Sequence, residues 1–213
     1  NGDGAICVDD HRTAEVCIMR NILYCNSGNG IRYMNGTTEQ AYKQGLSVLE
    51  TCGAVYPNRE GRYQLTPQGV RLAQMPLHPR LAHMLLVGCD IHATETACLL
   101  AAVLSERNPL ASAGVDLAGT LAVLMGEQQC PPAAQGWFRR IWQQARRFAR
   151  IASDIHKPRR FAISVETIDV MGVLIASAYP DRIARRRDGS ADYQLSNGRS
   201  GWLPGEDPLA TEA

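Results

Sequence analysis

The chain has 213 residues, of which 45% are hydrophobic and 20% are charged, and its 22 basic and 21 acidic side chains leave a net charge of +1. This composition is typical of a globular protein that can bury a core, and it excludes a chain that is basic or acidic throughout. The longest apolar run, residues 97–104, is far shorter than the roughly 20 residues of a membrane-spanning helix.

The cysteine pattern favours free thiols. The seven cysteines are odd in number and form no C-x-x-C pair, which argues against a disulfide framework and against a zinc ribbon. The nearest approach to a metal-ligand spacing, Cys7, His11, Cys17 and Cys25, matches no standard zinc finger. We therefore expect a cytoplasmic protein without a metal site.

The first elements along the chain predict a winged-helix module over residues 37–76. Residues 1–36 are rich in Gly and Asn and stay unassigned, apart from one short helix expected within residues 14–24. Thr37 or Thr38 can cap a helix that ends near Gly53, and strands expected at 54–56 and 63–65 flank a turn. Thr66-Pro67 then supplies the cap and first residue of the next helix.

The following residues, 77–178, predict a helical bundle. Its expected helices are Pro79–Gly88, Thr94–Ser105, Asp116–Met125, Trp137–Ser153 and Val165–Ala178. Strands expected at 193–195 and 201–203 indicate the start of a β domain over residues 179–213 that the chain does not finish. The predicted fold class is therefore mainly α, a winged-helix module followed by a bundle, with a short C-terminal β segment.

Positive charge is concentrated in residues 137–187, which hold 12 basic and 4 acidic side chains. At about 100° per residue, the expected helix 137–153 carries its apolar side chains, including Trp142 and Phe148, on one side. We assign these two aromatic residues to the core rather than to base stacking. The opposite side holds five arginines and, within this stretch, no acidic residue: Arg139, Arg140, Arg146, Arg147 and Arg150.

A second basic cluster follows the last helix of the bundle, and it consists of Arg182, Arg185, Arg186 and Arg187. Guanidinium groups bind phosphate in a bidentate manner, so both clusters are candidate nucleic-acid-binding surfaces. The alternatives are an ordinary solvated helix face for the first cluster and a domain-joining segment for the second. Phosphate contacts would make binding fall steeply with salt.

No motif for catalysis is present. The sequence has no Gly-Lys pair of a phosphate-binding loop, no H-E-x-x-H and no G-x-S-x-G, and its five histidines are scattered. We therefore predict no catalytic residue, no cofactor-binding residue and no metal ligand in this chain, and we expect it to be inactive alone.

Three blocks of sequence, in order, resemble a known family. GRYQLTPQG at 61–69 and AQMPLHPRLAHML at 73–85 resemble the region that follows the motor domains of DEAH-box RNA helicases. ACLLAAVLSERNPL at 97–110 and AYPDRIARRR at 178–187 are similar to the bacterial HrpB branch of that family. The resemblance implies two RecA-like motor domains followed by a winged helix, a ratchet-like bundle and an OB-like domain.

This resemblance implies an accessory region of an ATP-dependent RNA helicase, which guides single-stranded RNA, or DNA, beside motor domains of the same polypeptide. ATP and Mg²⁺ would be bound, and ATP hydrolysed, by those domains and not by this chain. Because the first residue is Asn rather than Met, we expect a piece of a longer protein. Two alternatives stay open: a free-standing winged-helix DNA-binding regulator, and a protein-interaction module.

Overall fold

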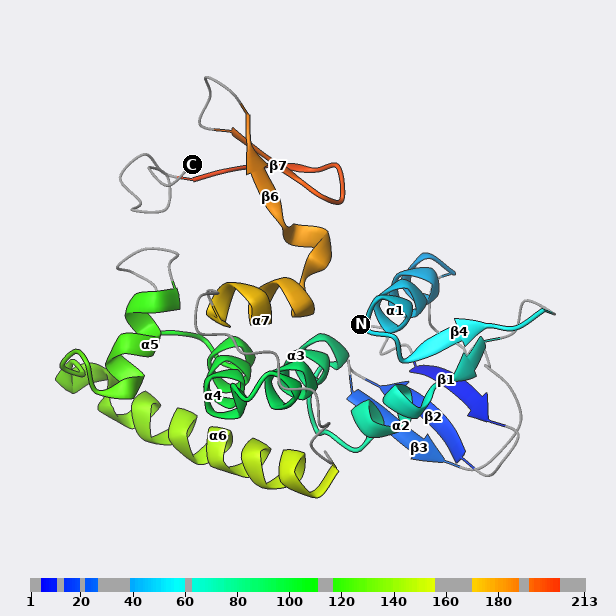
Figure 1. Cartoon of the computed structure of the whole chain (residues 1–213), viewed down its shortest axis with the longest axis horizontal. Coiled ribbons are helices and arrows are strands. Elements are labelled where there is room, and N and C mark those ends of the chain that lie inside the picture. Colours follow the sequence, from blue (N-terminus) through cyan, green and yellow to red (C-terminus); the bar gives the residue numbers. More distant parts are fainter. Residues whose placement is uncertain are drawn as a thin grey trace. The chain divides into compact units, whose positions relative to one another are not determined.

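The computed structural model describes residues 5–10, 14–19, 22–26, 39–59, 63–110, 117–155, 170–187 and 192–203 (Figure 1). The chain divides into two compact units, one formed by residues 1–86 and 151–158 and the other by residues 87–150 and 159–213. The described residues are mainly helical with small antiparallel sheets, which confirms the predicted fold class.

The first unit begins with a three-stranded antiparallel sheet in the order β1-β2-β3. Its strands are β1 (Ala5–Asp10), β2 (Ala14–Met19) and β3 (Ile22–Asn26). The helix expected within residues 14–24 was wrong. The β-branched residues Val16 and Ile18 favour a strand, and only two residues separate β2 from β3, which is the spacing of a tight hairpin.

A helix, a hairpin and a second helix follow in the first unit, as predicted. They are α1 (Glu39–Thr51), β4 (Val55–Pro57), β5 (Tyr63–Leu65) and α2 (Pro67–Ala73). Val55 pairs with Leu65 across the hairpin, β5 also contacts β1, and α2 contacts β3. The assignment of residues 37–76 to a winged-helix module stays a prediction.

Thr66 joins these elements. Its hydroxyl accepts a hydrogen bond from the Gly69 N–H at 2.9 Å, which caps α2, and donates one to the Gly53 carbonyl at 2.6 Å. Gly53 has a φ of +64°, the left-handed conformation that ends α1. Gly69 is required by packing, because a Cβ there would collide with the Ala54 carbonyl oxygen.

Helix α3 (Pro79–Asp90) continues beyond Gly88, where the sequence predicted its end. Gly88 lies within the helix, and its place in the fold is explained by close packing rather than by a helix end. A Cβ at Gly88 would collide with Cβ of Ala97 on α4 (Thr94–Ser105), so the missing side chain lets the two helices approach. Helix α4 has the predicted bounds, and all of its residues from Ala97 to Val103 are buried.

The remaining helices of the second unit are α5 (Leu117–Met125), α6 (Gln135–Ile155) and α7 (Val170–Ala178). Helix α4 contacts both α5 and α7. Helix α6 follows a short 3-10 turn, η2 (Pro132–Ala134), and is longer at both ends than predicted. Its last residues, from Ile151, are counted with the first unit.

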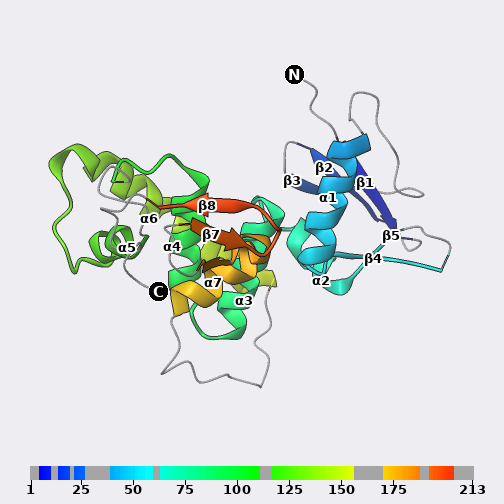
Figure 2. The same ribbon diagram turned by 90° about the horizontal axis from the view of Figure 1, so that it is seen from above.

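A second three-stranded antiparallel sheet follows α7, in the order β6-β7-β8, and Figure 2 labels β7 and β8. A 3-10 turn, η3 (Pro180–Arg182), leads into β6 (Ala184–Arg186), β7 (Asp192–Leu195) and β8 (Ser200–Trp202). The sequence predicted β7 and β8 to within about a residue but not β6. Arginine and alanine have little strand preference of their own, so β6 depends on its pairing with β7.

Candidate nucleic-acid interface

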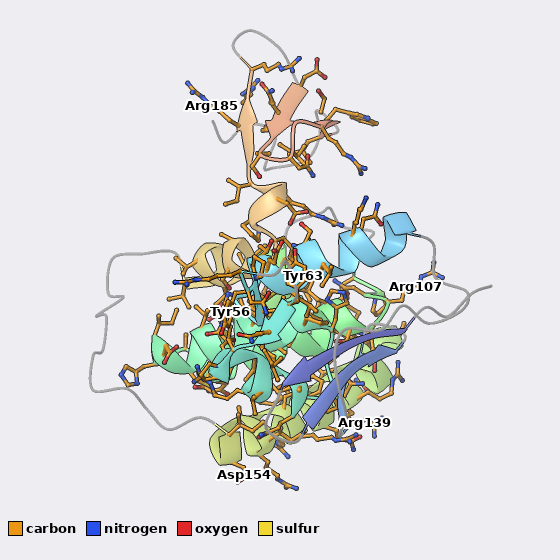
Figure 3. All side chains as sticks on the ribbon, turned by 90° about the vertical axis from the view of Figure 1, so that its right-hand side faces the viewer. Tyr56, Tyr63, Arg107, Arg139, Asp154 and Arg185 are labelled. Carbon is orange, nitrogen blue, oxygen red and sulfur yellow. The ribbon has the colours of Figure 1, made fainter. Side chains whose placement is uncertain are left out.

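Helix α6 separates its two faces sharply. The apolar side is buried by packing, and it includes Ile141, Ala145, Phe148 and Ala152, none more than 7% exposed. All five arginines of the predicted basic face are exposed, and Figure 3 labels Arg139. Burial of the apolar side fixes the rotation of the helix, so the arginines are held toward solvent by the core beneath them.

The arginines form two rows along the helix. Arg139, Arg146 and Arg150 are seven and four residues apart, so they share one stripe and are separated by about 10 and 6 Å along the axis. Arg140 and Arg147 form a parallel row beside it. We call the first set the arginine row. A regular helix holds these charges in a line, which suits an extended polyanion.

Glu106 partly neutralises the second row. The Arg140 Nε lies 3.6 Å from Oε2 of Glu106, and the Gln144 amide donates a hydrogen bond to Oε1 of the same carboxylate at 2.8 Å. Because the Arg140 side chain is 60% exposed, solvent weakens this ion pair. The sequence did not reveal the pair, since Glu106 follows α4 and is 34 positions from Arg140.

The basic face is also less uniform at its C-terminal end than the sequence predicted. Helix α6 continues to Ile155, which brings the exposed Asp154 onto the same face, four residues after Arg150. The arginine row therefore ends beside an acidic side chain.

Arg146 lies against an aromatic side chain of its own helix. Its guanidinium carbon is 5.8 Å from the centre of the Trp142 ring. The Trp142 indole N–H donates a hydrogen bond to the Leu124 carbonyl at 3.1 Å, which fixes the ring. Phe148 is buried as predicted, but Trp142 is only half-buried and so is not purely a core residue.

The second basic cluster is exposed throughout but does not face one way. The Arg182 guanidinium lies 5.2 Å over the Tyr179 ring. Strand alternation puts Arg185 and Arg187 on one face of the sheet and Arg186 on the other. In Figure 3, Arg139 and Arg185 lie far apart, at opposite ends of the view, so the structure does not bring the two clusters together.

Sequence reasoning missed Trp202 in this sheet. Trp202 pairs with Asp192 in the register of β8 with β7, on the face that also holds Arg185, and it is 72% exposed. Strand alternation over residues 200–202 places the Trp202 side chain on one face of the sheet. That this face also holds Arg185 could be predicted only once β6 was known to be a strand.

Among the described residues, no group of three or more His, Cys, Asp or Glu could hold a metal ion. Among the described helices, none is both long and apolar enough to cross a membrane. Burial lowers the pKa of His83, and that ring is hydrogen-bonded through Nδ1 to the Gln68 amide at 2.9 Å. We assign no residue to ATP or Mg²⁺.

Comparison with known proteins places these features in a class. No family model matches the chain. It is 29% identical over 163 residues to the ATP-dependent RNA helicase HrpB of Escherichia coli, over 76% of this chain and 17% of the relative. It is 28% identical over 98 residues to the DExH-box ATP-dependent RNA helicase DExH2 of Arabidopsis thaliana, over 45% of this chain and 6% of that one.

A crystal structure of the E. coli DExH-box NTPase HrpB matches the fold with a TM-score of 0.58 and 25% identity, over 84% of this chain and 19% of that one. The chain is therefore similar to part of a DExH-box helicase. More particularly, sequence and structure confirm the resemblance to the C-terminal region of HrpB-like DEAH-box helicases. The chain spans less than a quarter of the length of these relatives.

Proposed function

We propose that this chain is the accessory region of an ATP-dependent RNA helicase and that it guides single-stranded RNA beside RecA-like motor domains of the same polypeptide. The observation that carries the proposal is the exposed arginine row on α6, in a bundle whose fold is similar to that of E. coli HrpB. ATP and Mg²⁺ would bind to the motor domains, so hydrolysis is assigned to them.

The arginine row supports a guiding role on physical grounds. Each guanidinium that meets a phosphate releases condensed counterions, a gain that does not depend on base sequence. The rigid helix and its buried apolar side hold the charges in place before the strand arrives, so little ordering is required on binding. A strand that is pulled past such a surface can exchange one phosphate for the next without a change in contact chemistry.

The domain boundaries belong to the same proposal. Residues 37–76 would form a winged helix, 77–178 a ratchet-like bundle and 179–213 part of an OB-like domain. Helix α1 has a single basic residue, Lys43, and it also carries the exposed Glu50. This charge pattern is poorly suited to a phosphate groove. We therefore favour packing against another domain over duplex DNA reading for the winged helix. The predicted cytoplasmic location is kept as part of the proposal.

Charge reversal tests the function directly. The variant Arg139→Glu/Arg146→Glu/Arg150→Glu should weaken binding of the chain to a fluorescent single-stranded RNA by at least tenfold at about 100 mM salt. It should also flatten the dependence of the affinity on salt, because phosphate contacts are lost. Fluorescence anisotropy measures both quantities, and circular dichroism checks the fold.

A matched control separates a local effect from a change in net charge. Lys43→Glu/Arg59→Glu/Arg71→Glu makes the same change in charge within the first unit, and we expect it to bind RNA nearly as the unmodified chain does. If the two triple variants lose the same affinity, or if the α6 variant binds RNA unchanged, the arginine row does not guide the strand. A preference for duplex DNA would favour the regulator alternative.

A further inference from the structure

An open groove runs beside the arginine row, between the end of α5 and the start of α6. It has a volume of about 480 Å³, and it is lined by Leu124, Met125, Gly126, Phe138, Arg139, Trp142, Gln143 and Arg146. All of these residues belong to the second unit. The groove therefore involves two of the three residues of the row, Arg139 and Arg146, and it adds a surface of different chemistry next to them.

Its walls are mainly apolar and are held in place. Trp142 is fixed by its hydrogen bond to the Leu124 carbonyl, and Met125 is 47% exposed beside it. Gly126 ends α5 with a φ of +83°, and no atom lies within 4 Å of the position where a Cβ would stand. The missing side chain leaves this end of the groove open to a ligand.

Its rim carries positive charge. Arg139 and Arg146 are exposed at positions about 10 Å apart along the helix, with the exposed Gln143 between them. A ligand that fits must therefore combine a flat apolar group with negative charge on either side of it. An unpaired nucleobase between two phosphates has this chemistry, and RNA-binding proteins hold such bases on aromatic rings and on guanidinium planes.

We propose that this groove holds one unstacked base of the single strand while Arg139 and Arg146 bind the phosphates that flank it. The inference rests on the proposed function and adds to it a base-binding site. Gln143 is the sole uncharged side chain in the lining that offers amide hydrogen bonds, so the site tolerates all four bases. Each captured base would hold the strand in register against the helix, which phosphate contacts alone do not do.

An abasic strand provides the test. We expect the chain to bind a ten-nucleotide RNA about tenfold more tightly than an abasic backbone of the same length and charge, because the stacking of one base on an aromatic surface contributes an effect of about this size. Met125→Ala should weaken binding of the normal strand about threefold, leave the abasic strand unaffected, and keep the salt dependence unchanged. Met125 is exposed at the end of α5, so this variant preserves the core.

Two controls keep the outcome specific. Val70→Ala removes an exposed apolar side chain from α2 and should change neither affinity. Trp202→Ala removes an exposed indole outside the groove, and the chain should keep its preference for the normal strand over the abasic strand. The proposal is overturned if the normal and abasic strands bind equally, or if Met125→Ala leaves the normal strand unaffected.

Failure of this inference can be told apart from failure of the proposed function. If the arginine triple variant loses RNA while Met125→Ala has no effect, the strand follows the row without using the groove, and a protein segment becomes the better candidate for its occupant. If the arginine triple variant binds as the unmodified chain does, the guiding function itself is wrong.

Discussion

Two regions of the chain differ in their surroundings. The TPQG block, which resembles the helicase family, makes contacts within the fold, whereas the arginines of α6 face solvent. In the first unit, three residues of the TPQG block make internal contacts. Thr66 caps a helix, Gln68 donates a side-chain hydrogen bond, and Gly69 allows a close backbone approach. On α6, the five arginines are exposed to solvent on the side opposite the buried apolar residues. The motif that carries the resemblance is thus a packing motif.

Gln68 illustrates the difference. Its amide donates a hydrogen bond to the Cys52 carbonyl at 2.8 Å and is 2.9 Å from Nδ1 of His83. One side chain of α2 therefore joins the end of α1 to α3. A family resemblance built on such residues indicates which fold is present, while the binding chemistry must be sought on surfaces where spacing and charge, rather than a short motif, are informative. The predictions below separate these two kinds of residue.

The largest effect is expected at Gly69. Gly69→Ala would force the new methyl group against the Ala54 carbonyl, and we expect it to lower the free energy of unfolding by about 3 kcal/mol. Urea denaturation followed by circular dichroism measures this loss. Gly119→Ala on α5 is the matched control, because no atom lies within 4 Å of its new methyl group, and it should gain up to about 1 kcal/mol through helix propensity. Equal stability of the two variants would contradict the packing role.

An intermediate effect is expected from His83. Burial lowers its pKa in the folded chain below the ordinary value of 6.5, so the unfolded chain takes up a proton first as the pH falls. This contribution to stability is therefore complete above about pH 6.5 and should be lost progressively as the pH falls below that value. His83→Gln should reduce this drop. Burial, and to a lesser extent Arg80, also lowers the pKa of His78, so part of the drop should remain.

The smallest effect is expected at Glu106. Glu106→Gln keeps an oxygen for the hydrogen bond from Gln144 but removes the charge that faces Arg140. Exposed ion pairs are worth little, so stability should change by less than about 0.5 kcal/mol. RNA affinity should rise about twofold, because a neutralised arginine becomes available to a phosphate. The control is Glu127→Gln, an exposed acidic residue after α5. A fall in affinity would show that Arg140 needs Glu106 for its position.

Local signals explain what the sequence predicted well. Helix bounds followed from caps, prolines and apolar spacing, as at Thr66-Pro67 and in α4, where the structure agrees closely. The exposed row on α6 followed from the same periodicity. Strands β1, β2, β3 and β6 were missed because strands depend on partners elsewhere in the chain, and Gly88 was misjudged because its neighbour on α4 cannot be seen from sequence.

The candidate site shows the same limit. The arginines of α6 were found from sequence, but the groove beside them requires Met125 and Gly126, which precede α6 by about ten residues and lie at the C-terminal end of α5. The ion pair of Arg140 likewise depends on how α6 packs near the end of α4. Periodicity gives the direction of a side chain, whereas the neighbours that give it a chemical role are set by tertiary packing.

Strand β6 has a practical consequence for handling the protein. Among the described strands of its sheet it stands at an edge, where unpaired backbone groups invite another strand to add on. Its residues include Arg185 and Arg186, whose like charges repel a second copy of the same edge. Replacing these arginines to study ligand binding would therefore also remove a barrier to aggregation, and light scattering should accompany any such experiment.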